Sequence, residues 1–152
     1  MISRRWRAPG LRLACTLAPL LLAGGARAAP DPCKLLTPAQ VAAALGSQFG
    51  AGQPIGTTGC SWTSPSPHII VTLSLWPPGE WERVKAGPIP GTKITPTSGL
   101  GEDAFYVTLA QYTVLYVKKG QSVFLFKVYG VSDPAKQMSA EKTLAAEAMK
   151  QV

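Results

Sequence analysis

Two blocks of alternating apolar and polar residues predict the strands of this chain. In the first block, residues 60–63 precede a turn rich in serine and proline, and residues 68–76 follow it with apolar side chains at every second position. An antiparallel hairpin is the expected structure. In the second block, residues 104–109, 113–118 and 122–130 are separated by short turns, which predicts a three-stranded meander. Together the blocks predict an antiparallel sheet of about five strands.

Helix signals stand before and after these strands. Residues 37–40 (Thr-Pro-Ala-Gln) are typical of a helix start. The threonine can cap the helix, and the glutamine completes a capping box. The proline stands at the first helical position, where its missing N–H costs nothing. Gly46 is the expected end of that helix. A C-terminal helix is predicted to begin at Asp133 or at Ser139 and to end near Gln151. Helices on either side of a run of strands indicate an α+β fold, with the sheet packed against N- and C-terminal helices.

The intervening segments carry weaker signals. Residues 47–59 and 87–99 are rich in glycine, threonine and proline and are expected to be loops. Residues 80–86 are expected to form a short helix. The pattern as a whole, with one composition throughout, predicts a single compact domain.

The meander has two faces, one of which is expected to form the core. The core face is predicted to carry Phe105, Val107, Leu109, Leu115, Val117, Phe124, Phe126 and Val128. The other face is predicted to carry Tyr106, Tyr112, Tyr116 and Tyr129, together with Lys118 and Lys127. Tyrosine rings offer a large contact area at low entropic cost, so these four tyrosines are the candidate ligand-binding residues. The alternative is that the loop 87–99 or a helix covers this face.

Residues 1–28 are typical of a secretory signal peptide. Arg4, Arg5 and Arg7 are followed by an apolar run and by the small-residue sequence 26–28 (Ala-Arg-Ala). The apolar run, of about 13 residues, is shorter than the roughly 20 that cross a bilayer, which disfavours a retained anchor. We therefore expect residues 29–152 to be one exported domain, secreted or periplasmic, without a transmembrane segment. Arg4 and Arg5 also suggest twin-arginine export, but Arg7 stands where that signal has an apolar residue and Pro9 follows closely, which favours general secretion.

The leader also accounts for most of the positive charge. The whole chain has 15 basic and 8 acidic residues and a net charge of +7. The first 28 residues contain five of the arginines and no acid, so cleavage leaves 10 basic residues against 8 acidic ones. With so small a surplus, no basic patch is expected and nucleic acid is excluded as a partner.

Cleavage would leave two cysteines, Cys33 and Cys60. An even number of cysteines in an exported domain favours a disulfide. A metal or redox pair is disfavoured, because the spacing is not Cys-x-x-Cys and no histidines accompany it. We expect one structural disulfide.

Side chains suited to catalysis are sparse. His68 is the only histidine and is expected to lie in solvent at a strand start. Glu102 and Asp103 are neighbours in sequence, and neighbouring side chains point apart in a strand. No catalytic residue, metal site or cofactor is expected.

Four sequence segments carry a family resemblance. They are residues 31–46 (beginning Asp-Pro-Cys-Lys-Leu-Leu-Thr-Pro), 59–62 (Gly-Cys-Ser-Trp), 99–105 (Gly-Leu-Gly-Glu-Asp-Ala-Phe) and 117–120 (Val-Lys-Lys-Gly). The chain resembles a family of small exported bacterial proteins of uncharacterised function, many of them lipoproteins of actinobacteria. The resemblance implies a disulfide between the matching cysteines and brings no catalytic residue. No cysteine stands at the cleavage point, so a lipid anchor is not implied for this chain.

These observations predict a non-enzymatic binding or interaction domain, expected to be monomeric. Its ligand would be a protein, a peptide or a component of the cell envelope. The alternative is an enzyme, or an enzyme inhibitor, that acts on envelope polymers, and an inhibitor would present the loop 87–99. A third possibility is a purely structural partner in an envelope complex.

Overall fold

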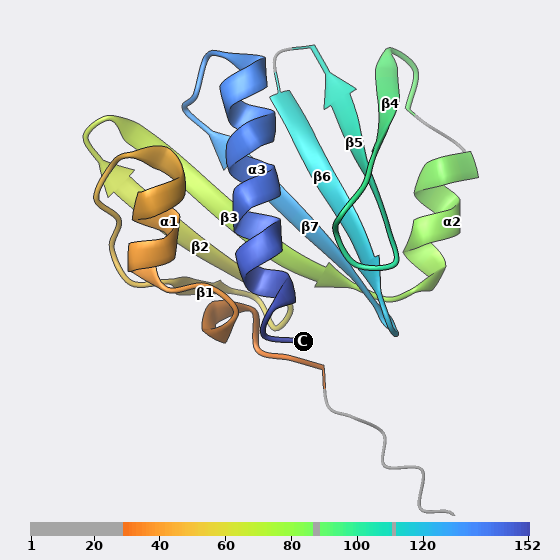
Figure 1. The fold of residues 1–152 in the computed structure, drawn as a ribbon, viewed down its shortest axis with the longest axis horizontal. Helices are drawn as coiled ribbons and strands as arrows, with labels where there is room; N and C mark the ends of the chain where they lie inside the picture. The colour runs from red at the N-terminus through yellow and green to blue at the C-terminus, as the bar shows by residue number, and fades with distance from the viewer. Residues whose placement is uncertain (1–28, 87–88, 111) are drawn as a thin grey trace, which may run out of the picture.

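The computed structural model describes residues 29–86, 89–110 and 112–152, so the predicted signal peptide lies outside the described residues. A seven-stranded antiparallel sheet with three α-helices forms the α+β fold (Figure 1). The elements in chain order are the 3-10 helix η1 (Pro32–Lys34), α1 (Pro38–Leu45), β1 (Gln53–Ile55), β2 (Gly59–Pro65), β3 (His68–Trp76), α2 (Gly79–Ala86), β4 (Thr92–Thr97), β5 (Asp103–Leu109), β6 (Tyr112–Lys119), β7 (Ser122–Tyr129) and α3 (Pro134–Met149).

The sheet has seven strands rather than the predicted five, in the order β1-β2-β3-β7-β6-β5-β4. The hairpin and the meander are present, and β3 pairs with β7 to join them. The two additional strands, β1 and β4, lie at the two edges, within segments that the sequence predicted to be loops. Each contains a proline, Pro54 in β1 and Pro96 in β4. Edge strands tolerate proline because one side of their main chain needs no partner.

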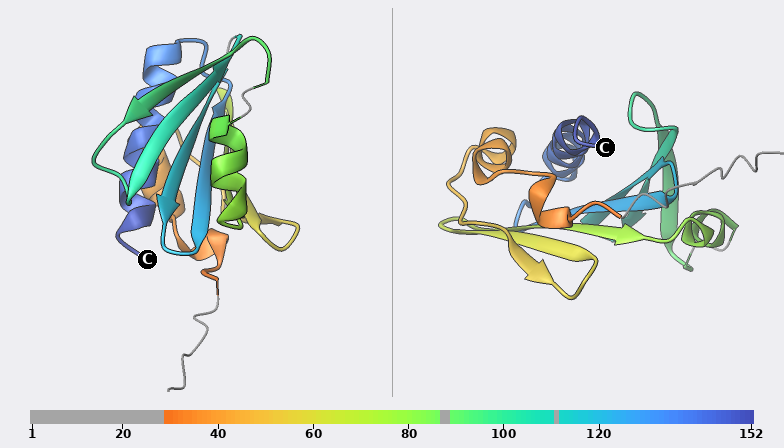
Figure 2. Two further views of the ribbon diagram at one scale, coloured as in Figure 1. Left: turned by 90° about the vertical axis from the view of Figure 1, so that its right-hand side faces the viewer. Right: turned by 90° about the horizontal axis from the view of Figure 1, so that it is seen from below.

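Helices cover both faces of the sheet, but unequally. Figure 2 shows α1 and α3 together on one side of the sheet, with α2 near the end formed by β4 and β5. The main core lies under α1 and α3. Its strand residues include Trp62, Val71, Leu73, Leu115, Val117, Phe124, Phe126 and Val128, and its helix residues include Val41, Leu144, Ala145 and Ala148. A smaller core under α2 contains Trp81, Phe105, Val114, Tyr116, Val123 and Leu125.

This second core shows that the predicted division of the meander into faces was wrong for β5. The register pairs Tyr106 with Leu115 and Phe105 with Tyr116. Tyr106 therefore lies on the main-core side, whereas Phe105, Val107 and Leu109 lie on the α2 side. The remaining predicted core residues of β6 and β7 are in the main core. Both faces of these strands are apolar because helices cover both. The alternation therefore could not show which face of β5 continues the main-core face of β6 and β7.

The predicted helix signals act as expected. Thr37 caps α1, Gln40 completes the capping box, and Gly46 ends the helix in the left-handed conformation with φ of 69°. Helix α3 begins after Asp133 rather than at Ser139, because the Asp133 side chain accepts hydrogen bonds from the N–H groups of Ala135 and Lys136.

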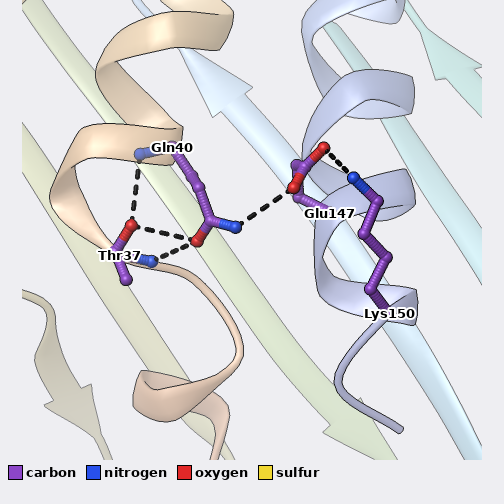
Figure 3. Close-up of polar contacts among 4 residues, drawn as sticks. All are labelled: Thr37, Gln40, Glu147 and Lys150. Carbon is purple, nitrogen blue, oxygen red and sulfur yellow. Dashed lines mark hydrogen bonds and ion pairs between the residues drawn. The ribbon is translucent and has the colours of Figure 1, made fainter.

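Gln40 also joins α1 to α3 (Figure 3). Its Oε1 accepts hydrogen bonds from the Thr37 N–H at 2.9 Å and from the Thr37 hydroxyl at 3.0 Å. Its Nε2 donates to Oε2 of Glu147 at 3.1 Å, and Lys150 reaches Oε1 of the same carboxylate at 2.5 Å. The hydrogen bond from Lys150 and then that from Gln40 lower the pKa of Glu147. One side chain thus completes a helix cap and holds the two helices together.

Replacing Gln40 by alanine is expected to lower the free energy of unfolding by about 1 kcal/mol, because both the cap and the contact with Glu147 are lost. Urea denaturation of the two proteins measures the difference. Gln48→Ala, which removes an exposed glutamine beyond the helix end, is the matched control and is expected to have no effect. Equal stabilities of the Gln40→Ala and Gln48→Ala variants would show that the interhelix contact contributes nothing.

Candidate functional site

Strands β6 and β7 separate at one end of the sheet. Their pairing runs from Leu115 and Phe126 to Lys119 and Ser122. Beyond it, Thr113 still pairs with β5 and Val128 still pairs with β3. The first turns of α3 lie over this part of the sheet (Figure 1). The main-chain groups of Thr113 and Val128 that face the gap therefore need other partners.

Two side chains of α3, Gln137 and Glu141, supply those partners, and we call this pair the polar wedge. The Thr113 N–H donates to Oε1 of Gln137 at 3.3 Å, and Nε2 of Gln137 donates to the Val128 carbonyl. The Val128 N–H donates to Oε1 of Glu141 at 3.2 Å, and the Thr113 hydroxyl donates to Oε2 at 2.9 Å. The wedge thus replaces sheet pairing with hydrogen bonds to side chains.

The Glu141 carboxyl group is fully buried in this wedge. Burial raises its pKa to about 7, against the opposing effects of the hydrogen bonds from Thr113 and Val128 and of the Lys127 charge. Burial, and then the nearby Glu141 charge, raises the pKa of Tyr106 to about 12. The Tyr106 hydroxyl donates to the Met138 carbonyl at 2.9 Å, which fixes the phenol against α3.

A hollow of about 480 Å³ opens beside the wedge. Its lining residues are Ala110, Tyr112, Tyr129, Gly130, Val131, Ser132, Pro134 and Gln137. The side chains of Tyr112 and Tyr129 are each 39% exposed there. None of the described residues that line the hollow carries a charge. The arrangement suits contact with an uncharged group through aromatic rings and hydroxyl donors.

The wall of the hollow is held by Gly130. This residue has a φ of +86°, and a Cβ atom at its position would lie 2.1 Å from the His68 carbonyl oxygen. Only glycine allows β7 to end so close to the start of β3. The close contact between Gly130 and the His68 main chain therefore fixes the position of Tyr129 and of the segment that leads to α3.

Comparisons of the chain with protein-family models, with curated proteins and with solved structures found no match. The function of the hollow is therefore inferred from its geometry and chemistry.

The structure separates the four tyrosines that the sequence predicted to share one binding face. Tyr112 and Tyr129 lie at the hollow and are exposed, whereas Tyr106 and Tyr116 are buried. Tyr106 packs in the main core. Tyr116 stacks on Phe105 at a centroid distance of 5.2 Å under α2, and burial raises its pKa. Buried rings cannot contact a ligand directly, so only Tyr112 and Tyr129 remain candidates.

None of the other sequence candidates is among the described residues that line the hollow. Glu102 accepts a hydrogen bond from the Gly120 N–H at 2.8 Å, while Asp103 forms an ion pair with Lys85 at 3.0 Å. His68 is exposed at the start of β3. In the part of the chain that the structure describes, no three His, Cys, Asp or Glu side chains group as metal ligands would. No described helix is long and apolar enough to cross a membrane.

Gln137 and Glu141 were missed at the sequence level. Both project from the side of α3 that carries Leu144, Ala145 and Ala148, all of them buried. An acidic residue on an apolar helical stripe is unusual unless it has partners inside the protein. That spacing could have marked Glu141, although the partners on β6 and β7 could not be named from it.

The predicted disulfide is confirmed. Cys33, in η1, bonds to Cys60, in β2, over a sequence separation of 27. Cys60 is fully buried beside Trp62 in the main core. A disulfide in a small domain is compatible with an oxidising compartment.

Proposed function

We propose that this chain is an exported, non-enzymatic binding domain whose ligand is a protein, a peptide or a component of the cell envelope. The observation that carries the proposal is the hollow, in which two exposed tyrosines are held by paired strands. We further propose that the chain belongs to the family of small exported bacterial proteins that its four sequence segments resemble.

The strands and main-chain contacts that hold the hollow favour binding, because few residues must become ordered when a ligand binds. Tyr112 and Tyr129 belong to strands that pair with β5 and β3, respectively. Gly130 fixes one wall, and Gln137 of the polar wedge is part of the lining. Preorganised aromatic side chains contribute strongly to affinity, because a rigid ring loses little entropy on binding. The uncharged lining favours an uncharged part of the ligand.

The same geometry supports a non-enzymatic role. Acid and base catalysis needs titratable groups that converge on the position of a substrate. None of the described lining residues is an aspartate, a glutamate, a histidine, a lysine or a cysteine, and Glu141 is buried. The carboxylates of Glu102 and Asp103 are engaged elsewhere.

Export is proposed from the leader pattern together with the disulfide. A basic start, an apolar run and a small-residue cleavage sequence are typical of signal peptides. A disulfide that links η1 to the core is stable outside the cytosol.

The proposal is tested by capture from envelope extract. The chain is expressed with its own leader, purified in oxidised form and immobilised, and the eluate is analysed by mass spectrometry for proteins and glycans. The captured ligand is then titrated against Tyr112→Ser and Tyr129→Ser variants. Each change is expected to weaken binding about tenfold, the loss of one aromatic contact, without altering thermal stability. A clean blank at high bait concentration would refute the proposal.

An inhibitor that uses the segment before β4 is the second candidate. Ile89 is the observation that favours it, because this side chain is 68% exposed. Exposed large apolar side chains often serve as anchors in interfaces. Ile89→Ser is therefore the matched control. Loss of capture in Ile89→Ser, with both tyrosine variants unaffected, would favour the inhibitor over the tyrosine-lined hollow.

A further inference from the structure

The Glu141 carboxyl group closes a gap between two strands while fully buried, and it forms no ion pair with any described residue. We propose that this carboxyl group is a proton-operated latch: its protonation tightens the start of α3 against β6 and β7, and its ionisation loosens the lining of the hollow at Gln137. The geometry of the polar wedge supports the proposed latch. Its consequence for ligand binding rests on the proposed function.

The groups that face Glu141 leave its charge poorly compensated. From β7 the Val128 N–H donates a hydrogen bond, and the Lys127 charge favours the ionised form. From β6 the neutral Thr113 hydroxyl donates another. From β5 comes the neutral phenol of Tyr106. Two neutral donors and one more distant cation do not replace the water that a carboxylate loses on burial.

Protonation removes this charge without removing a hydrogen bond. The Thr113 hydroxyl can rotate and accept from the protonated Oε2, since a hydroxyl both donates and accepts. The Val128 N–H continues to donate to Oε1. The wedge is therefore satisfied in both states, and the electrostatic cost of the buried charge is what distinguishes them.

The direction of the effect follows from linkage. In the closed wedge the pKa is raised to about 7 from its ordinary 4.5, and in an opened, hydrated wedge it returns toward that ordinary value. The closed state thus binds the proton more tightly. Its stability is fully present below about pH 4.5, falls between pH 4.5 and 7, and is constant above. The wedge would open about 200-fold more often at pH 8 than at pH 4.

Gln137 connects this opening to the hollow. It belongs to the wedge through Thr113 and Val128, and it also lines the hollow. When the start of α3 moves away from the sheet, the hollow loses this part of its lining. A ligand that contacts the closed wedge at Gln137 is expected to bind more tightly in mildly acidic surroundings than at neutral pH.

Hydrogen exchange of the Thr113 and Val128 amides tests the latch in the exported, oxidised protein. Their protection, corrected for the intrinsic exchange rate, is expected to fall by about two orders of magnitude between pH 4.5 and 8. Glu141→Gln keeps an acceptor for Val128 and a donor for Thr113 without a charge. In this variant the protection is expected to be independent of pH and as high as in the acidic wild-type protein.

Two controls keep the test decisive. If the variant does not fold, a carbon NMR titration of the Glu141 carboxyl group in the wild-type protein replaces it, and an ordinary midpoint would overturn the latch. The Leu73 amide in β3 reports opening of the whole sheet. Protection of Val128 that does not change with pH, or that equals that of Leu73 at every pH, would also overturn it. A protein that shows the pH dependence but captures no ligand would keep the latch and reject the proposed function.

Discussion

Gly130→Ala is expected to lower the free energy of unfolding by about 3 kcal/mol or more. The new Cβ would lie 2.1 Å from the His68 carbonyl oxygen and 3.2 Å from the Ile69 Cα, so the clash is with main chain that no rotamer change relieves. A φ of +86° adds conformational strain for any residue with a Cβ. To accommodate alanine, the end of β7 must separate from the start of β3. Urea denaturation measures the loss, and the amide spectrum shows whether Tyr129 has moved.

The matched control is Gly120→Ala in the turn between β6 and β7. Gly120 also has a positive φ, +58°, but a Cβ there would meet nothing within 4 Å. Its substitution is expected to cost only about 1 kcal/mol, the conformational preference alone. The difference between the two variants therefore measures the close approach of the two strands. Similar losses for both would mean that the contact with His68 has no energetic importance.

The sequence predicted those elements whose stabilising contacts lie within a few residues along the chain. The capping box of Thr37 and Gln40 and the left-handed Gly46 are satisfied within a few residues, so they could be identified without the fold. The long alternation at residues 68–76 likewise predicted β3, whose even and odd positions face different environments. The disulfide followed from the cysteine count and the expected compartment.

The edge strands could not be predicted in this way. All three residues of β1 are exposed, and β4 has no buried residue. Without a buried face there is no apolar alternation to recognise, and Pro54 and Pro96 lower the strand propensity further. Pairing with the neighbouring strand, and not their own sequence, makes these segments strands.

The site shows the same limit more strongly. The sequence identified Tyr112 and Tyr129, but it grouped them with Tyr106 and Tyr116. The register between β5 and β6 puts Tyr106 on the other face, whereas Tyr116 shares the face of Tyr112 and is buried under α2. A shift of one residue in register exchanges the faces of a whole strand. The polar wedge joins Gln137 and Glu141 to residues of β6 and β7, and only the tertiary fold brings these together.

Removal of the disulfide is the second large effect, and it is expected to separate stability from binding. On the chain-entropy estimate, closing the segment between Cys33 and Cys60 stabilises the fold by about 3 to 4 kcal/mol. A Cys33→Ala/Cys60→Ala double variant should lose about this much in urea denaturation. The bond joins η1 to β2. In Figure 1, η1 lies near the C-terminal end of α3, whereas the lining residues Pro134 and Gln137 belong to the start of that helix. The folded variant should therefore bind a captured ligand as tightly as the wild-type protein, in contrast to Gly130→Ala.

Reduction of the wild-type protein under native conditions controls for the alanine side chains and should give a similar loss of stability. If binding weakened in parallel with stability, the hollow and the disulfide would belong to one cooperative unit, and the assignment of the ligand contact to the end beside α3 would have to be abandoned.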